Sequence, residues 1–278
     1  MTRVAVPVLL TLALAAGALP LSAQFLPEEI AARPALEEFL LTAEIAASEP
    51  IGEGVTKPFK LTLVKDGVTR KAAWKNPSGE QLGFLEGWQY ELAAYRLDKL
   101  LGLNMVPPAV EREFQGRRGA LVLWADNKCS LLELVEEGIV IPPEAVERTE
   151  KMKWLIRAWD SLIANEDRTQ QNILYTEDWR TIAFDHSRAF RSTKEFCERL
   201  MFGRNGLKVS AQGAPWLFRR LPRSFVDRLR ALTFEDVKAA VGPTLKDKEI
   251  RAVISRRQLL LDEIGLMIKE QGEDKVLY

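Results

Sequence analysis

The chain has 278 residues, of which 47% are hydrophobic and 28% are charged, and its 39 lysines and arginines balance 39 aspartates and glutamates. A neutral balance gives no electrostatic case for binding nucleic acid. The only histidine is His186, which excludes a multi-histidine metal site and a serine–histidine pair elsewhere in the chain. No repeat or low-complexity linker divides the sequence, so one globular protein is expected.

The first 23 residues have the pattern of a secretory signal peptide. Arg3 precedes an apolar run over residues 4–18, and Leu21-Ser22-Ala23 ends in a small residue suited to cleavage. Pro20 interrupts the segment, and the apolar run is shorter than the ~20 residues that a membrane span needs. We expect cleavage near Ala23, no stable membrane span afterwards, and a secreted or periplasmic mature protein.

Export would place the two cysteines, Cys129 and Cys197, in an oxidising compartment. A bridge closing the long loop between them would stabilise the fold by about 4 kcal/mol in the chain-entropy model. Two free thiols are the alternative, and the sequence does not decide between them.

Two strand patterns follow an expected helical extension over residues 24–43. Phe59–Val64 alternates polar and apolar residues, Asp66-Gly67 is a turn signal, and the second strand, Arg70–Lys75, ends in lysine. Gly52 and Gly54 precede the first strand, where residues without a Cβ let backbone amides approach phosphates closely.

The next segment, residues 88–103, has helical periodicity. Ala93, Leu97 and Leu100 follow one apolar stripe, whereas Glu91 lies off it near the helix start. Because Glu91 lies off the apolar stripe, it can face a cleft, and it is the expected partner of Lys75. Glu86 is the alternative partner. Lys71 is expected to be solvated. Two further strands, residues 110–114 and 120–124, predict a hairpin that leads into a hinge at residues 125–127.

Asp167, Asn172 and Asp185 carry the clearest chemical signal. Short strand patterns at residues 172–175 and 181–184 predict a hairpin that brings Asn172 and Asp185 together beside the Asp167 loop. A phosphoryl-transfer enzyme needs a carboxylate to accept the proton of the acceptor, and an amide and a second carboxylate to hold Mg²⁺. These residues meet that need, although Glu166 competes with Asp167 as the base.

This order of glycine loop, lysine strand, glutamate helix, hinge, catalytic loop and metal strand resembles the protein-kinase fold in its atypical branches. The most similar groups are secretory-pathway kinases, phosphatidylinositol 3- and 4-kinases, and bacterial toxin-type serine/threonine kinases. The resemblance covers roughly residues 44–265 and is reinforced by Glu91–Tyr95 and by Asp160–Asn165 with Asp167-Arg168.

The resemblance implies an α+β, two-lobed fold with a small β-rich N-lobe and a larger helical C-lobe, binding ATP and Mg²⁺ or Mn²⁺ between the lobes. The implied roles are the catalytic base for Asp167, metal ligands for Asn172 and Asp185, an ion pair for Lys75 and Glu91, and phosphate binding for Gly52 and Gly54.

The sequence also departs from the kinase pattern. Asn165-Glu166-Asp167 replaces H-R-D, Asp185-His186-Ser187 replaces D-F-G, and Lys57 occupies the place of a third glycine. No A-P-E motif closes an activation segment, so regulation by loop phosphorylation is not expected.

We divide the chain into a signal peptide (1–23), a helical extension (24–43), a kinase-like N-lobe (44–127), a kinase-like C-lobe (128–270) and a frayed polar tail (271–278). The expected function is phosphorylation of a hydroxyl acceptor, with protein serine or threonine favoured. A nucleotide-binding pseudokinase or scaffold, and a sugar, lipid or small-molecule kinase, are the alternatives. Aromatic and arginine residues after Asp185 are expected on the acceptor-facing surface or on a solvated face: Arg188, Phe190, Arg191, Arg204, Trp216 and Arg219 are among them.

Overall fold

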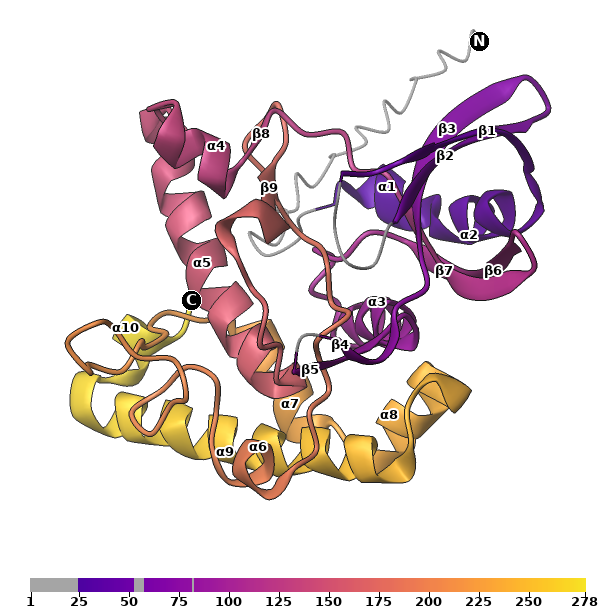
Figure 1. Cartoon of the computed structure of the whole chain (residues 1–278). Helices are drawn as coiled ribbons and strands as arrows, with labels where there is room; N and C mark the ends of the chain where they lie inside the picture. The colour runs from indigo at the N-terminus through magenta and orange to yellow at the C-terminus, as the bar shows by residue number, and fades with distance from the viewer. Residues whose placement is uncertain (1–24, 53–57, 82) are drawn as a thin grey trace, which may run out of the picture.

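The computed structural model describes residues 25–52, 58–81 and 83–278 (Figure 1). The expected signal peptide and Gly54 lie outside the described residues. The described chain forms two lobes, a β-rich lobe from the N-terminal half and a helical lobe from the C-terminal half.

A five-stranded antiparallel sheet, in the order β1-β2-β3-β7-β6, builds the N-lobe. Its strands are β1 (Glu44–Pro50), β2 (Phe59–Lys65), β3 (Val68–Lys75), β6 (Ala109–Phe114) and β7 (Arg117–Leu123). The alternation predicted for β2 is present, because Leu61 and Leu63 are fully buried whereas Thr62 between them is partly exposed. With Ala72 and Trp74 of β3, these leucines form one apolar face.

Helix α2 (Arg33–Thr42) covers that apolar face and is preceded by the short helix α1 (Pro27–Ala31). Leu40 of α2 packs into the same cluster of buried residues as Leu61 and Trp74. Residues 27–31 and 33–42 of the expected extension are thus helical, and Pro34 falls within the first turn of α2, where its missing N–H has no helical partner to lose.

A further N-lobe helix, α3 (Gln89–Leu101), ends at Gly102 in the left-handed conformation, φ 57°. Ala93 and Leu97 are buried as the stripe predicts, but Leu100 is exposed. A two-stranded hairpin that the sequence did not indicate, β4 (Ser78–Gln81) with β5 (Phe84–Gly87), lies between β3 and α3 in the chain.

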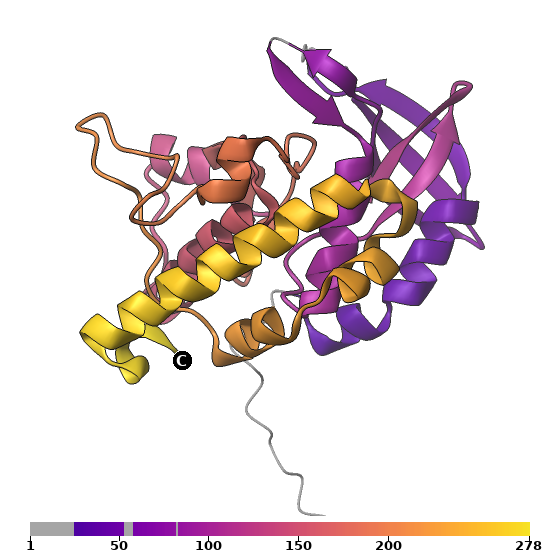
Figure 2. The same cartoon turned by 90° about the horizontal axis from the view of Figure 1, so that it is seen from below.

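The C-lobe begins at a three-stranded sheet in the order β10-β9-β8, made of β8 (Cys129–Ser130), β9 (Ile173–Tyr175) and β10 (Thr181–Ala183). Its helices are α4 (Leu131–Glu136), α5 (Pro143–Ile163), α6 (Lys194–Glu198), α7 (Arg223–Ala231), α8 (Phe234–Val241), α9 (Asp247–Gln271) and α10 (Glu273–Val276), with 3₁₀ turns η1 (Gln170–Asn172) and η2 (Gly242–Thr244). Figure 2 shows α9 crossing the underside of the molecule, and it packs against α5, α6 and α7.

The chain end differs from the frayed polar tail that was expected. Val276 and Leu277 are 1% and 5% exposed, and Leu277 forms a parallel bridge with Leu221. The sequence did not indicate this apolar contact, because the preceding residues, 271–275, are mostly polar. Cys129 and Cys197 are both free thiols in the structure.

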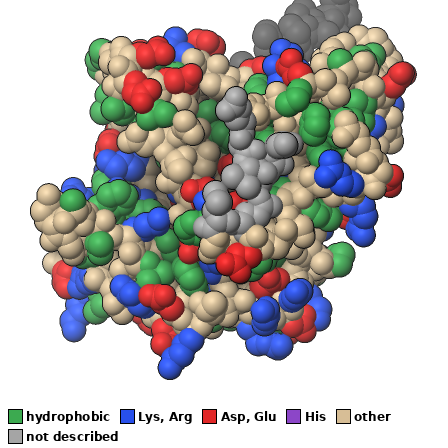
Figure 3. Space-filling view, viewed as in Figure 1, with side chains coloured by type: hydrophobic (Ala, Val, Ile, Leu, Met, Phe, Trp, Pro, Cys, Tyr) green, Lys and Arg blue, Asp and Glu red, His purple; other side chains and the backbone are tan. Residues whose placement is uncertain are grey.

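Charged side chains of both signs are scattered over the face shown in Figure 3, in keeping with the neutral charge balance. Among the described helices, none combines the length and the apolar character that crossing a membrane requires.

Candidate active site

Lys75, at the end of β3, contacts one carboxylate from each lobe. Its Nζ lies 3.0 Å from Oε1 of Glu91, in the first turn of α3, and 3.2 Å from Oδ1 of Asp185, which follows β10. The side chains of Lys75 and Glu91 are 12% and 3% exposed. Burial disfavours the charged lysine, but the carboxylates of Asp185 and Glu91 outweigh it and raise the pKa of Lys75.

Glu91 is held at its other oxygen as well. The backbone N–H of His186 donates to Glu91 Oε2 at 3.1 Å. Burial alone would favour the neutral acid, but Lys75 and His186 lower the pKa of Glu91, so it is a carboxylate at neutral pH. Glu86, the alternative partner of Lys75, instead pairs with Arg188 at 2.6 Å.

The β9–β10 hairpin brings Asn172 and Asp185 together. Ile173 pairs with Ala183 in the ladder, and the Phe184 N–H donates to the Asn172 carbonyl oxygen at 3.2 Å. Asp185 then adopts a left-handed backbone conformation, φ 58°, which residues other than glycine adopt uncommonly and which often marks functional sites.

Two atoms of this pair suit a hard divalent cation. The Asn172 side chain donates its Nδ2 hydrogen to the Asp167 carbonyl oxygen at 2.9 Å, which leaves its Oδ1 as the oxygen able to bind a cation. Asp185 uses Oδ1 to contact Lys75 and Ser187, which leaves Oδ2 available. Within the described residues no cluster of three His, Cys, Asp or Glu side chains could hold a metal by itself. The pair therefore fits Mg²⁺ or Mn²⁺ that takes its remaining ligands from phosphate and water.

Asp167 and Glu166 are adjacent but have different surroundings. Glu166 forms an ion pair with Arg191, and its backbone carbonyl accepts a hydrogen bond from Lys208. The Asp167 side chain is 38% exposed and lies 3.4 Å from Arg188 Nη1. Burial raises the pKa of Asp167, Arg188 opposes that rise, and the Asp185 charge adds to it. Asp167 is thus the less constrained of the two carboxylates.

Arg168 connects these elements, a role that the sequence did not reveal. Its guanidinium pairs with Asp160 of α5 at 2.9 Å and donates to the Asn172 carbonyl oxygen at 3.0 Å. It also donates to the Phe184 carbonyl oxygen, so a single side chain fixes α5, η1 and the end of β10. The signal available was the Asp167-Arg168 pair itself, which is one of the features shared with the atypical kinases.

His186 is fully buried beside Glu91. Its Nε2 lies 3.0 Å from Arg168 Nη2 and 3.4 Å from Trp159 Nε1, both of which are donors, so Nε2 accepts and the ring is neutral. Burial lowers the pKa of His186, in agreement with this assignment. The ring therefore supports Arg168 and does not act as a base.

Arg188 and Arg191, expected on an acceptor-facing surface or on a solvated face, both form ion pairs with carboxylates at the site. Arg188 bridges Glu86 and Asp167, and Gly87 N–H donates to the Ser187 carbonyl oxygen at 2.9 Å. The β4–β5 hairpin thereby fastens the segment after Asp185 to the N-lobe. Gly52 has a left-handed φ of 59° and open space where a Cβ would stand.

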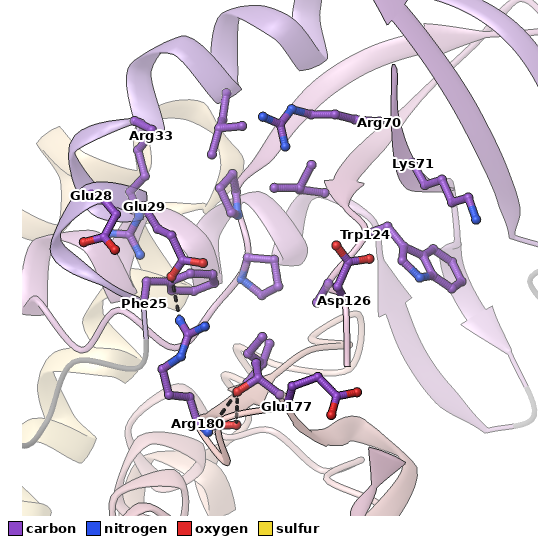
Figure 4. Close-up of a pocket in the computed structure, with 18 of the residues that line it drawn as sticks. Phe25, Glu28, Glu29, Arg33, Arg70, Lys71, Trp124, Asp126, Glu177 and Arg180 are labelled. Carbon is purple, nitrogen blue, oxygen red and sulfur yellow. Dashed lines mark hydrogen bonds and ion pairs between the residues drawn. The ribbon is translucent and has the colours of Figure 1, made fainter. Parts of the chain in front are cut away.

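The larger of two prominent cavities, about 790 Å³, lies behind the hinge (Figure 4). Lys75, Asp167 and Asp185 do not line it. Phe25, Arg33, Arg70, Trp124 and Asp126 are among its walls. On the side shown at the bottom of Figure 4, Arg180 pairs with Glu29 and Asp178, which ties the N-terminal helices to the β9–β10 turn.

Comparison with protein-family models and with curated proteins finds no match to the sequence. Comparison with solved structures does. A Golgi casein kinase matches with a TM-score of 0.57 and 14% identity over 88% of this chain and 78% of that one. The Helicobacter pylori proinflammatory kinase CtkA matches with a TM-score of 0.53 and 11% identity over 84% of this chain and 96% of that one.

The chain has an atypical protein-kinase-like fold. The matches extend over most of the described chain, so both the sheet-based N-lobe and the helical C-lobe belong to this α+β fold. At these identities the likeness establishes the fold, and function has to be argued from the site.

Proposed function

We propose that the protein is an ATP-dependent kinase that transfers the γ-phosphoryl group to a hydroxyl acceptor, with Mg²⁺ or Mn²⁺ in the site. The observation that carries the proposal is the convergence of Lys75, Glu91 and Asp185 at 3.0 to 3.2 Å, with Asn172 and Asp167 joined to the same hairpin. Two kinase structures share the fold, which supports the proposal without assigning the activity.

Each residue has a distinct task in the proposed reaction. Lys75, held by Glu91, presents its ammonium to the nucleotide phosphates, and Gly52 belongs to the loop expected to cover them with Gly54. Asn172 Oδ1 and Asp185 Oδ2 would hold the divalent ion, which neutralises phosphate charge when bound. Arg168 keeps the catalytic loop and the Asp185 strand in register.

Asp167 accepts the proton in the transfer step. The acceptor oxygen forms a bond to the γ-phosphorus as the bond from that phosphorus to the β–γ bridging oxygen breaks, and the acceptor proton passes to the Asp167 carboxylate. ADP leaves with the bridging oxygen. A base whose pKa is raised toward the working pH is more effective in this role than one held by a strong ion pair, such as Glu166.

The intact set of Lys75, Asp167, Asn172 and Asp185 favours an active kinase over a pseudokinase, since each group needed for transfer is present.

We further propose that the protein acts outside the cytoplasm, because Arg3, the apolar run over residues 4–18 and Ala23 form the pattern of a signal peptide. Intact-mass measurement of protein from its native host tests this, and recovery of cytoplasmic protein that keeps residues 1–23 would contradict it.

The decisive test of mechanism compares two isosteric substitutions. Asp167→Asn removes the base and keeps its shape, so phosphotransfer should fall by about 10²- to 10⁴-fold while nucleotide affinity stays near wild type. Glu166→Gln is the matched control and should retain most of the activity. An inactive Glu166→Gln with an active Asp167→Asn would move the base by one residue, and unchanged rates in both would refute the kinase mechanism.

A further inference from the structure

A second cavity, of about 460 Å³, opens beside Asp167. Phe84 of the β4–β5 hairpin, Phe196 of α6, and Met201 and Leu207 of the following loop form its apolar walls. Lys75, Glu91 and Asp185 do not line it. The cavity thus adjoins the proposed base but is not lined by the groups assigned to the phosphates, so it is open to the acceptor.

The charged groups around this cavity already have partners. Arg188 is shared by Glu86 and Asp167, and Glu195 pairs with Arg199 at 3.2 Å. The Lys208 ammonium donates to the Glu166 carbonyl oxygen at 2.8 Å, while the Glu166 side chain pairs with Arg191.

This arrangement selects among acceptor classes. A sugar site needs several convergent polar groups that are free to bind hydroxyls, and a strongly acidic acceptor needs several cations. Arg188 is already paired with carboxylates, so among the lining cations Lys208 alone keeps its charge for an acceptor. Apart from these partnered charged groups, the cavity offers two aromatic rings, a methionine and a leucine beside the Asp167 carboxylate, a surface suited to an apolar group.

We propose that this cavity receives a large apolar side chain that neighbours the phosphorylated hydroxyl, so that the acceptor is a polypeptide with Ser or Thr within two residues of Leu, Met or Phe. The inference rests on the proposed kinase function. Successive Cα atoms are about 3.8 Å apart, so an extended segment places a hydroxyl at Asp167 and a nearby side chain against Phe84 and Phe196 in the same cavity.

The test uses the full-length protein with ATP, Mg²⁺ and serine peptides that carry Leu, Ala, Asp or Lys at each position from two before to two after the serine. At one or more positions, kcat/KM should be about 10- to 100-fold higher for Leu than for Ala, which corresponds to burial of the larger side chain. Preference for Asp, or equal use of all peptides, would overturn the proposal, as would faster transfer to monosaccharides tested alongside.

Acceptor-independent ATP hydrolysis, measured in parallel, separates this inference from the kinase function. ATP hydrolysis that depends on Asp185, without phosphorylation of any peptide, would overturn the peptide proposal and leave the phosphotransferase standing. Absence of nucleotide binding, hydrolysis and transfer altogether would overturn both.

Phe84 and Leu85 supply a matched pair of variants, because they are neighbours on β5, are 42% and 48% exposed, and only Phe84 lines the cavity. Phe84→Ala should reduce the ratio of kcat/KM between Leu and Ala peptides by about threefold or more, because the leucine side chain would then bury less apolar surface in the cavity. Leu85→Ala should keep the wild-type ratio. Because each result is a ratio within one variant, a general loss of activity does not mimic it, and equal ratios in both variants would contradict the assignment.

Discussion

Two of the cations that bridge a pair of carboxylates invite comparison, one in the candidate active site (the front cluster) and one behind the hinge (the rear cluster). Lys75 joins Glu91 to Asp185, and Arg180 joins Glu29 to Asp178. Both clusters tie the N-terminal half to the β9–β10 region, and they differ mainly in one carboxylate: Glu91 is 3% exposed, whereas Asp185, Glu29 and Asp178 are 34%, 40% and 53% exposed.

Burial decides what each cluster can do. Water screens the rear cluster, so its ion pairs are worth about 0–1 kcal/mol and serve as a surface fastening. In the front cluster, the low exposure of Lys75 and Glu91 strengthens the interaction between them, and removing Lys75 leaves the Glu91 charge buried. The same arrangement of charges is therefore a weak surface contact in one place and a partly buried ion pair in the other.

The largest contrast should appear when one carboxylate is removed from each cluster. Asp185→Ala should abolish metal-dependent nucleotide binding measured by calorimetry, because a hard cation loses its charged ligand. Asn172→Ala should weaken that binding less, since it removes a neutral ligand. Asp178→Ala is the control and should bind as wild type does; a normal metal-dependent signal from Asp185→Ala would show that the metal is held elsewhere.

Replacing the buried Lys75 should lower the free energy of unfolding far more than replacing an exposed lysine. Lys75→Met leaves the Glu91 carboxylate buried without its cation and should lower the free energy of unfolding by about 3–5 kcal/mol in urea titrations at neutral pH. The loss should shrink in acid, because without Lys75 the buried Glu91 takes up a proton more readily. Lys71→Met, an exposed change on the same strand, should stay within about 0.5 kcal/mol. Equal losses from the two variants would refute the distinction.

The pH dependence of the reaction should test the assignment of Asp167, which lies beside the front cluster, as the base. Asp167 must be deprotonated to accept a proton, so kcat/KM should fall as the pH drops through its raised pKa. Arg188→Met removes a cation that opposes that rise, so the acidic limb of the profile should move to higher pH. A limb that stays in place in Arg188→Met would mean that another group controls it.

The smallest effect is expected behind the hinge. Arg180→Met breaks the ion pairs with Glu29 and Asp178, both well exposed, and should change the free energy of unfolding by about 0–1 kcal/mol. Nucleotide binding should remain near wild type. A loss comparable to that of Lys75→Met would show that the rear cluster carries more of the fold than its exposure implies.

Local patterns predicted much of this site. The alternation in β2, the Asp66-Gly67 turn and the short strands around Asp178 are set by neighbouring residues, and they place Lys75 and bring Asn172 beside Asp185. Of the two glutamates considered as partners of Lys75, Glu91 makes the contact, as expected. The functional roles assigned to these residues stay predictions.

Contacts between distant segments could not be predicted in the same way. Arg188 and Glu86 lie far apart in sequence, and neither has a local pattern that indicates a partner, so the β4–β5 hairpin and the role of Arg188 emerged only from the packing. The buried Val276 and Leu277 were missed because polar residues precede them, and their partner Leu221 comes from a distant part of the chain.

The fastening of the segment after Asp185 bears on how activity would be controlled. Many kinases order the corresponding segment by phosphorylating it, so that arginines gain a phosphate to bind. Here Arg188 already binds the carboxylate of Glu86, which the chain itself supplies. A kinase held in this way would be switched on by folding alone, and its output would be set by its abundance and by the supply of ATP and acceptor.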